Sequence, residues 1–171
     1  MAWVASRDHR LMVCVNHWRP PKWLRLWMLA ATRGGDGGLW YALGLAVALY
    51  GGRERFHALL AATLAVVAGI ALFLELKRLF RRKRPCAMEA HCWADLLPPD
   101  QFSFPSGHTI TAFAVAVSLG GFYPEILPGL LFCAVSIAAS RVVLGMHFLS
   151  DVLAGAALGA TLGALATAAI R

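Results

Sequence analysis

Residues 56–76 read FHALLAATLAVVAGIALFLEL, an apolar stretch in which Glu75 is the only formally charged side chain. An α-helix that crosses a bilayer needs about 20 predominantly apolar residues, so this stretch predicts one full-length membrane span. Four further apolar stretches lie at 38–51, 106–123, 126–144 and 150–170. The pattern therefore predicts an all-α, polytopic helical membrane bundle with five transmembrane helices.

The composition of the chain is typical of a membrane protein. Of its 171 residues 59% are hydrophobic and only 15% are charged, against about 25% charged residues in soluble domains. The length fits one domain, which we expect over 1–171 with an interfacial segment at 1–35 and a transmembrane bundle at 36–171. The first ten residues mix charged side chains with few apolar ones, so no signal peptide is predicted.

The formal net charge of +7 limits the partners to expect. A basic surface can attract nucleic acid or anionic lipid, and in a membrane protein basic loops also set the orientation. In so apolar a chain lipid contact and orientation come first. We therefore expect the lipid bilayer as a partner and no nucleic acid.

Residues 6–33 do not form one clean span. Pro20 and Pro21 divide them, and Arg19, Lys22 and Arg25 interrupt the apolar residues. Tryptophans alternate with these charges, as in helices that lie in the headgroup region. Two interpretations stay open: interfacial amphipathic helices, or short helices packed on the rim of the protein itself.

Gly155, Gly159 and Gly163 recur every four residues in the last apolar stretch. Small residues at this spacing let two helices approach each other closely. The glycines can serve a homodimer interface or packing inside one chain, and we favour the second use.

Polar residues gather at the ends of the predicted spans. One group follows 56–76, a second opens 106–123, and a third straddles the junction of 126–144 with 150–170. Because successive spans cross in alternating directions, five spans place all three groups on one side of the membrane. The members are Lys77, Arg84 and Pro85; Pro105, Ser106, Gly107 and His108; and Ser140, Arg141, His147 and Asp151.

Three of these residues, Lys77, Arg84 and Arg141, are cations that would face one small site. Cations held together repel one another unless a multiply charged anion binds, and arginine matches phosphate oxygens in pairs. Ser106 and the N–H of Gly107 add neutral donors at a helix N-terminus, which itself favours anions. The group predicts a phosphate-binding site.

Two histidines supply chemistry that binding alone does not need. His147 and Asp151 lie four residues apart and share a face if both are helical. A carboxylate beside an imidazole fixes its tautomer and stabilises its cationic form, which makes His147 a candidate nucleophile. His108 would face it as the general acid that protonates the leaving oxygen.

Each of these residues also has an ordinary explanation. A basic run after a span is typical of a topology signal, a histidine near a span end is commonly interfacial, and an aspartate early in a helix favours the helix dipole. The coincidence of all three groups at one membrane face is what favours a functional site.

The three groups resemble the three-part signature of the type 2 phosphatidic acid phosphatase superfamily. Every signature position is matched, in the order Lys77-x6-Arg84-Pro85, Pro105-Ser106-Gly107-His108 and Ser140-Arg141-x5-His147-x3-Asp151. The resemblance covers just under half of the chain and implies a six-helix core, so the bundle is expected to hold five to six transmembrane helices. The turn at 32–36 also resembles a weaker segment of the family, to which we assign no catalytic role.

By this resemblance the site works without a metal or another cofactor. His147 forms a phosphohistidine with Asp151 as its partner, while His108 protonates the leaving group and then activates water. The phosphate would be held by Lys77, Arg84, Ser106, Gly107 and Arg141.

We therefore expect an integral membrane lipid phosphatase. Candidate substrates are an isoprenoid diphosphate, phosphatidic acid, phosphatidylglycerol phosphate or a lipid-linked sugar phosphate, and the residues do not choose among them. A lipid phosphotransferase that passes the phosphate to another lipid or sugar would use the same side chains. A membrane protein that only binds anions is disfavoured, because binding needs no nucleophile.

Two opposed signals bear on the side of the membrane that the site faces. Nearly all Lys and Arg residues lie on the site side if 1–35 does not cross, which indicates the cytoplasm. A disulfide between Cys86 and Cys92 in the loop before Ser106 would instead indicate an oxidising compartment. Most bacterial members of the family that the chain resembles face outward. We favour an extracytoplasmic site on a multi-pass protein of a bacterial-type inner membrane.

Overall fold

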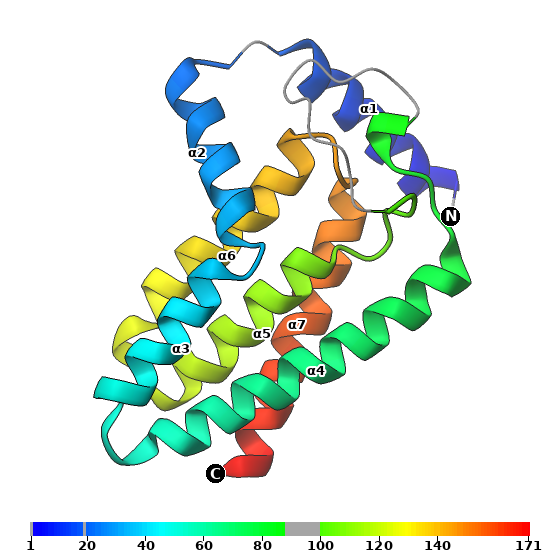
Figure 1. Ribbon diagram of the computed structural model, residues 1–171. Coiled ribbons are helices and arrows are strands. Elements are labelled where there is room, and N and C mark those ends of the chain that lie inside the picture. The colour runs from blue at the N-terminus through cyan, green and yellow to red at the C-terminus, as the bar shows by residue number, and fades with distance from the viewer. Residues whose placement is uncertain (1, 19, 88–99) are drawn as a thin grey trace.

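A computed structural model gives the fold, and the structure describes residues 2–18, 20–87 and 100–171. Those residues form α-helices and no strand, and one isolated bridge pairs Lys83 with Phe102. The prediction of an all-helical fold is confirmed (Figure 1). The helices are α1 (Ala2–His17), α2 (Lys22–Gly34), α3 (Gly38–Tyr50), α4 (Arg55–Phe80), α5 (Gly107–Phe122), α6 (Leu127–Val143) and α7 (Leu149–Ile170).

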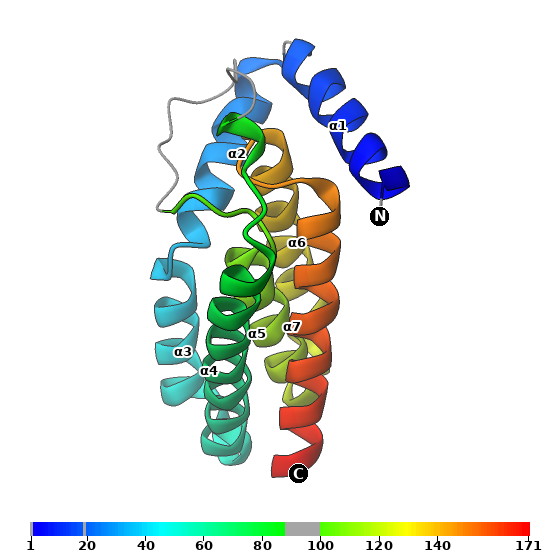
Figure 2. The same cartoon turned by 90° about the vertical axis from the view of Figure 1, so that its right-hand side faces the viewer.

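Helix α5 is the centre of the bundle. It lies against α4, α6 and α7 (Figures 1 and 2), and side chains on all sides of it are buried. A helix that is apolar all round is typical of a buried position. Ile110, Ala114 and Leu119 accordingly are at most 2% exposed, so the short third apolar stretch becomes the core of the fold.

The glycine stripe of α7 faces α5. A methyl group at Gly159 would lie 2.3 Å from the carbonyl oxygen of Ile110, and one at Gly155 would lie 2.8 Å from the carbonyl oxygen of Ser106. Gly163 continues the same close contact one turn further along α7. The stripe is used inside the chain, so a homodimer contact through these glycines would have to displace α5.

The outer faces of the long helices are apolar. On α4, Leu60, Leu64 and Val67 are 48%, 47% and 59% exposed. Large exposed apolar faces are unusual in water and typical of lipid contact. Three helical segments in the described ranges are long and apolar enough to cross a bilayer, while α3 and α5 are shorter, so the count of five spans stays a prediction. The three are Gly52–Phe80, Pro124–Val143 and Leu149–Ile170.

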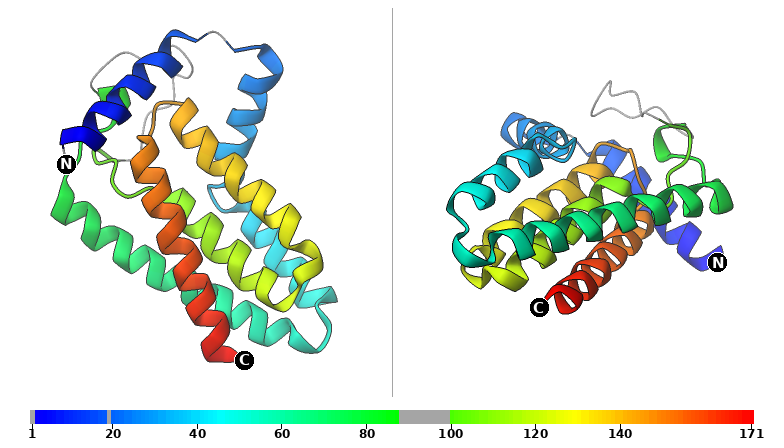
Figure 3. Two further views of the ribbon diagram at one scale, coloured as in Figure 1. Left: turned by 180° about the vertical axis from the view of Figure 1, so that it is seen from behind. Right: turned by 60° about the horizontal axis from the view of Figure 1, so that its bottom comes forward.

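The N-terminal segment forms two helices that separate at Pro20 and Pro21, as predicted. Helix α2 packs along α6 and buries Met28 and Thr32, and α3 follows it end to end after a glycine turn (Figures 1 and 2). Helix α1 lies beside the start of α7 (Figure 3). Both helices thus pack on the rest of the protein, and an interfacial position for 1–35 stays a prediction.

Helix α4 is longer than the sequence predicts. It begins at Arg55 and ends at Phe80 rather than at residue 76, and Arg81 closes it in a left-handed conformation with φ of 45°. Lysine and arginine are good helix formers and are favoured in a last turn. Lys77, which we expected after the end of this helix, therefore lies inside it and is buried.

The three signature groups lie at the end of the bundle that is remote from the C-terminus. Helices α4 and α6 end there, and α5 and α7 begin there (Figure 1). This is the placement that alternating spans predict for groups at their ends.

Candidate active site

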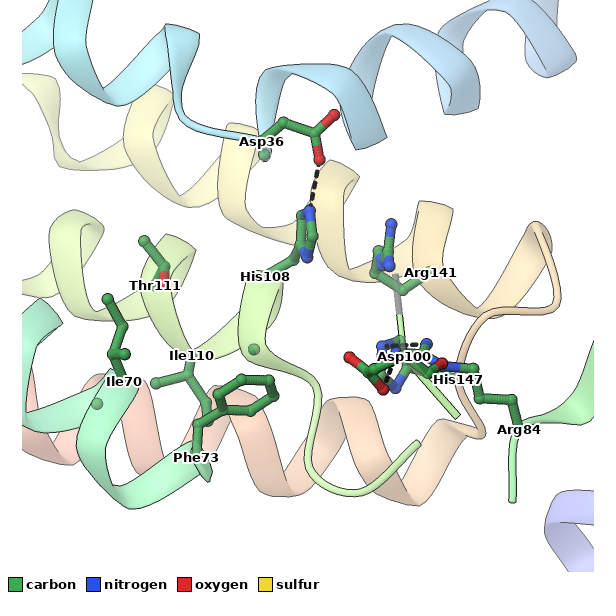
Figure 4. A pocket seen from close by; sticks show the side chains of 13 residues that line it. Asp36, Ile70, Phe73, Arg84, Asp100, His108, Ile110, Thr111, Arg141 and His147 are labelled. Carbon is green, nitrogen blue, oxygen red and sulfur yellow. Dashed lines mark hydrogen bonds and ion pairs between the residues drawn. The ribbon is translucent and has the colours of Figure 1, made fainter. Parts of the chain in front are cut away.

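A cavity of about 330 Å³ lies at this end of the bundle. Its wall combines an apolar side from α4 and α5 with polar residues from turns and helix ends (Figure 4). The apolar side includes Ile70, Phe73 and Ile110, and the polar residues are Asp36, Arg84, Asp100, His108, Thr111, Arg141 and His147. Two histidines and two arginines of the signature therefore share one cavity.

His147 lies in the short segment between α6 and α7, and its side chain is almost fully buried. Its Nδ1 donates to the carbonyl oxygen of Ser103 at 2.6 Å, which assigns the proton to that nitrogen and the lone pair to Nε2. Nε2 lies 3.2 Å from Nη1 of Arg84. Burial lowers the pKa of His147 to about 4, although Asp151 opposes the shift. The imidazole is therefore neutral near pH 7.

The predicted pair of His147 and Asp151 has a different geometry from the one we expected. Nδ1 of His147 and Oδ2 of Asp151 are 3.8 Å apart, which is too far for a hydrogen bond. His147 precedes α7, which begins at Leu149, so the two residues do not share a helix face. Asp151 caps the helix instead: Oδ2 accepts from the N–H of Phe148 at 2.9 Å, and Oδ1 accepts from Arg82 at 2.7 Å.

Arg84 and Lys77 meet at the carboxylate of Asp100. Arg84 donates from Nη2 to Oδ1 of Asp100 at 2.9 Å and from Nη1 to the carbonyl oxygen of Met146 at 2.8 Å. Nζ of Lys77 donates to Oδ2 of the same carboxylate and lies 4.3 Å from the ring centre of Phe73. Burial opposes ionisation of Asp100, but the two cations outweigh it and hold its pKa below the ordinary value. An anion thus already bridges two of the expected phosphate ligands.

Arg141 is the third cation, and its guanidinium is only partly satisfied. Nη1 donates to the hydroxyl oxygen of Thr32 on α2 at 2.6 Å. The Nε atom is buried and, among the residues that the structure describes, has no hydrogen-bond partner. A buried donor without a partner costs about 1–3 kcal/mol, so the guanidinium of Arg141 keeps an unmet donor at the site.

His108 and Gly107 open α5 at the wall of the cavity. Nε2 of His108 lies 2.7 Å from Oδ1 of Asp36, in the turn between α2 and α3. Ser106 precedes the helix and is fully buried, and its Oγ accepts from the hydroxyl of Thr109 at 3.0 Å. The start of α5 adds the backbone N–H groups that an anion can accept from.

The structure brings the predicted site residues together in two layers. Those that line the cavity are Arg84, Gly107, His108, Arg141 and His147. Those that are buried behind the lining are Lys77, Ser106 and Asp151. Lys77 reaches the cavity through its contact with Asp100.

Sequence reasoning missed several partners of these residues. Thr32 and Asp36 belong to the turn that resembles the family's weaker segment, so a signal for them existed. Asp100 and Ser103 lie in a loop without any periodic pattern. Arg82 lies in the basic run that follows 56–76, a pattern that by itself is typical of a topology signal.

Two further expectations concern cysteines and metals. Cys92 lies outside the described residues, so its disulfide with Cys86 stays a prediction. Within the described ranges, no group of three His, Cys, Asp or Glu side chains could hold a metal ion.

The chain matches the PAP2 superfamily over residues 55–171, which is more than half of its length. The chain belongs to the PAP2 superfamily. This is the superfamily that the three-part signature predicts, so that prediction is confirmed.

Individual proteins that are similar to this chain support its place in the superfamily. A decaprenylphosphoryl-5-phosphoribose phosphatase of Mycobacterium tuberculosis is 40% identical over 126 residues, which cover 74% of this chain and 68% of the relative. The crystal structure of a transmembrane PAP2-type phosphatidylglycerolphosphate phosphatase from Bacillus subtilis has a TM-score of 0.78 at 28% identity, covering 98% of this chain and 86% of that one. Aquifex aeolicus LpxE has a TM-score of 0.74 at 29% identity, covering 92% of each chain. The named relatives are lipid phosphatases, so the prediction that this chain is a lipid phosphatase is confirmed.

Proposed function

We propose that this PAP2 protein releases phosphate from a phosphomonoester on a membrane lipid, through a phosphohistidine at His147. The proposal is carried by the buried Nε of Arg141, a donor without a partner in the described part of the chain. The Arg141 side chain also lines the cavity that His147 and His108 line. A site that leaves a cationic donor open beside a neutral imidazole is suited to bind a phosphate and to attack it.

His147 is the nucleophile in the first half of the reaction. Ser103 holds the proton on Nδ1, so Nε2 has the lone pair, which accepts a hydrogen bond from Nη1 of Arg84 at 3.2 Å. The attack requires Arg84 to give up this hydrogen bond and donate to the phosphate instead. Nε2 forms a bond to phosphorus while the bond from phosphorus to the lipid oxygen breaks and its electron pair leaves with that oxygen. Protonated His108 gives its proton to the same oxygen, and the product is a lipid alcohol.

Water removes the phosphoryl group in the second half. The water oxygen bonds to phosphorus, the bond from phosphorus to Nε2 breaks, and neutral His108 takes a proton from the water. Asp151 lies 3.8 Å from Nδ1 of His147, where its negative charge stabilises the phosphorylated imidazole. The cycle ends with inorganic phosphate and with both histidines in their starting protonation states.

The phosphate binds among the signature cations and the start of α5. Because the carboxylate of Asp100 now accepts from two of these cations, an entering phosphate has to share or displace it. The residues proposed to hold the phosphate are Lys77, Arg84, Arg141, Ser106 and Gly107.

Among lipid phosphates, we propose a phosphomonoester on a polyprenyl-linked sugar as the substrate. The support is the 40% identity to a decaprenylphosphoryl-5-phosphoribose phosphatase over 74% of this chain. A substrate panel in detergent micelles compares this sugar phosphate with phosphatidylglycerol phosphate, phosphatidic acid and an isoprenoid diphosphate. A higher kcat/KM for the isoprenoid diphosphate would contradict the choice of a monoester.

We also propose that α3 to α7 form five spans and that the site faces the extracytoplasmic side. A disulfide between Cys86 and Cys92 would form there. Labelling that finds both thiols free in protein made under oxidising conditions would remove this support.

The central test compares wild-type protein with His147→Ala by phosphate release from the preferred lipid, with and without EDTA. The substitution is expected to lower kcat by about 10³-fold or more, whereas EDTA leaves the wild-type rate unchanged. His57→Ala is the matched control, since the His57 side chain is 60% exposed at the start of α4, far from the cavity. Activity that survives His147→Ala would end the proposed role of this residue.

A further inference from the structure

We propose that Asp36 is a positioning residue for His108 and that the turn between α2 and α3 is therefore part of the active site. The inference rests on the proposed function, because it concerns the proton that His108 gives to the leaving oxygen. It assigns a task to the one segment that the resemblance singled out without a role.

The first support is the contact between the two side chains. Oδ1 of Asp36 lies 2.7 Å from Nε2 of His108, a distance at which Nε2 keeps its proton and donates it in a hydrogen bond. The other ring nitrogen, Nδ1, is then the one that exchanges a proton with the substrate. Figure 4 shows Asp36 on one side of the His108 ring and the group of Arg84, Asp100 and His147 on another.

The second support is the shape of the turn. A Cβ atom on Gly35 would lie 3.0 Å from Cδ2 of His108 and 3.0 Å from Cγ2 of Ile137, so a side chain here would push one of these neighbours aside by a few tenths of an ångström. Gly37 has a φ of 127°, which residues with a side chain rarely adopt. Asp36 therefore lies between two glycines: a side chain at Gly35 would crowd His108, and one at Gly37 would strain the backbone.

The third support comes from the last turn of α2. Thr32 is 4% exposed and accepts a hydrogen bond from Nη1 of Arg141 at 2.6 Å. This contact orients the guanidinium whose Nε is left open in the described part of the chain. Thr32 and Asp36 thus orient a cation and an acid of the site from a segment that precedes the matched residues 55–171.

The charge of Asp36 matters because His108 is surrounded by cations. Arg84 and Arg141 line the same cavity and oppose a positive charge on the imidazole, whereas Asp36 favours it. The Asp36 side chain is 63% exposed, so water screens part of the attraction. Loss of this charge should therefore weaken proton donation without abolishing it.

The experiment asks whether Asp36 matters only when the leaving oxygen needs a proton. An alkoxide leaves poorly without a proton, whereas a nitrophenolate leaves well without one. The ratio kcat/KM covers the steps up to formation of the phosphohistidine and excludes the later attack of water. It is measured for wild-type protein and Asp36→Asn with a lipid alkyl phosphomonoester and with p-nitrophenyl phosphate.

Asp36→Asn keeps the size of the side chain and a hydrogen-bond acceptor but removes the charge. It is expected to lower kcat/KM for the lipid phosphomonoester by about 10- to 100-fold and for p-nitrophenyl phosphate by less than about threefold. Asp36→Glu should recover part of the loss, and Gly35→Ala, whose methyl group crowds the His108 ring, should lower kcat/KM for the lipid phosphomonoester in the same direction. Glu125→Gln, in an exposed turn at the opposite end of the bundle, is the matched control and should change neither value.

Equal losses for the two substrates, or no loss for either, would overturn the role of Asp36, because a merely structural contact does not distinguish leaving groups. The result is separable from the proposed function. Phosphate release that survives His147→Ala contradicts the function itself, whatever the effect of Asp36→Asn.

Discussion

Nη1 of Arg82 lies 2.7 Å from Oδ1 of Asp151, the carboxylate whose other oxygen faces His147. Nη2 of the same guanidinium lies 2.8 Å from Oδ2 of Asp8 on α1, and Asp8 also accepts from the N–H of Ser150 at 3.1 Å. Arg82 therefore balances two buried carboxylates and ties the N-terminal helix to the start of α7.

Replacing Arg82 with Gln should destabilise the protein and lower its activity. The change leaves Asp8 and Asp151, which are 5% and 0% exposed, without their cation, and breaking a buried ion pair from one side costs about 3–5 kcal/mol. The midpoint of thermal unfolding in detergent and the rate of phosphate release measure the two effects. Arg78→Gln is the control, because the Arg78 side chain is 74% exposed and its loss should cost less than about 0.5 kcal/mol.

A double variant separates charge from packing at this contact. In Arg82→Gln with Asp8→Asn, one of the two uncompensated carboxylates is gone, so part of the lost stability should return. A double variant no more stable than Arg82→Gln alone would contradict a charge-balancing role for Arg82.

The helices of this protein could be predicted because apolar runs of span length have few alternatives in a membrane. The stretches 106–123 and 150–170 became α5 and α7 with ends shifted by one residue at most. The location of all three signature groups at one end of the bundle followed from the alternating direction of the spans. This argument needs no knowledge of side-chain packing.

The contacts that complete the site could not be predicted in this way. Asp36 and Asp100 reach the cavity from loops, and a loop has no periodicity that shows which side chain points inward. The spacing places Asp151 and His147 on one face only if both are helical, but the helix begins after His147 and Asp151 caps it. Spacing along the chain identified the chemical groups, whereas tertiary packing decides which of them touch.

Replacing Asp100 with Asn should tighten the binding of phosphate. Its carboxylate bridges Lys77 and Arg84, the cations that a bound phosphate also needs. If the loss of this bridge makes the binding free energy of phosphate more favourable by about 1.4 kcal/mol, the competitive inhibition constant of inorganic phosphate falls about tenfold. Gln101→Ala changes an exposed neighbour in the same loop and should leave the constant unchanged. Weaker inhibition in Asp100→Asn would show instead that Asp100 aligns the two cations.

Acidification should destabilise the protein through His147. Burial lowers its pKa to about 4 from the ordinary 6.5, so between these values the unfolded chain binds the proton and the folded protein does not. Stability that is present above pH 6.5 is therefore lost as the pH falls towards 4. The measurement is the drop in the midpoint of thermal unfolding between about pH 7.5 and about pH 4.5.

His147→Gln provides the comparison for this pH effect, because it removes the titrating imidazole and leaves every carboxylate and every other histidine in place. The wild-type protein should lose more stability over the same pH range than this variant does. Equal drops in the two proteins would contradict a buried, neutral His147.

A methyl group added at Gly159 should separate α5 from α7 and disable the site. Its Cβ would lie 2.3 Å from the carbonyl oxygen of Ile110, a backbone atom that cannot move aside alone. The same interface positions the site, since the N–H of Ser106 donates to the carbonyl oxygen of Asp151 at 3.2 Å. Gly159→Ala is expected to cost about 3 kcal/mol or more and to abolish phosphate release.

At Gly129 a Cβ meets no heavy atom of the described chain within 4 Å, so Gly129→Ala should stabilise α6 by up to about 1 kcal/mol. Similar unfolding midpoints for the two variants would contradict the close contact of α5 with α7.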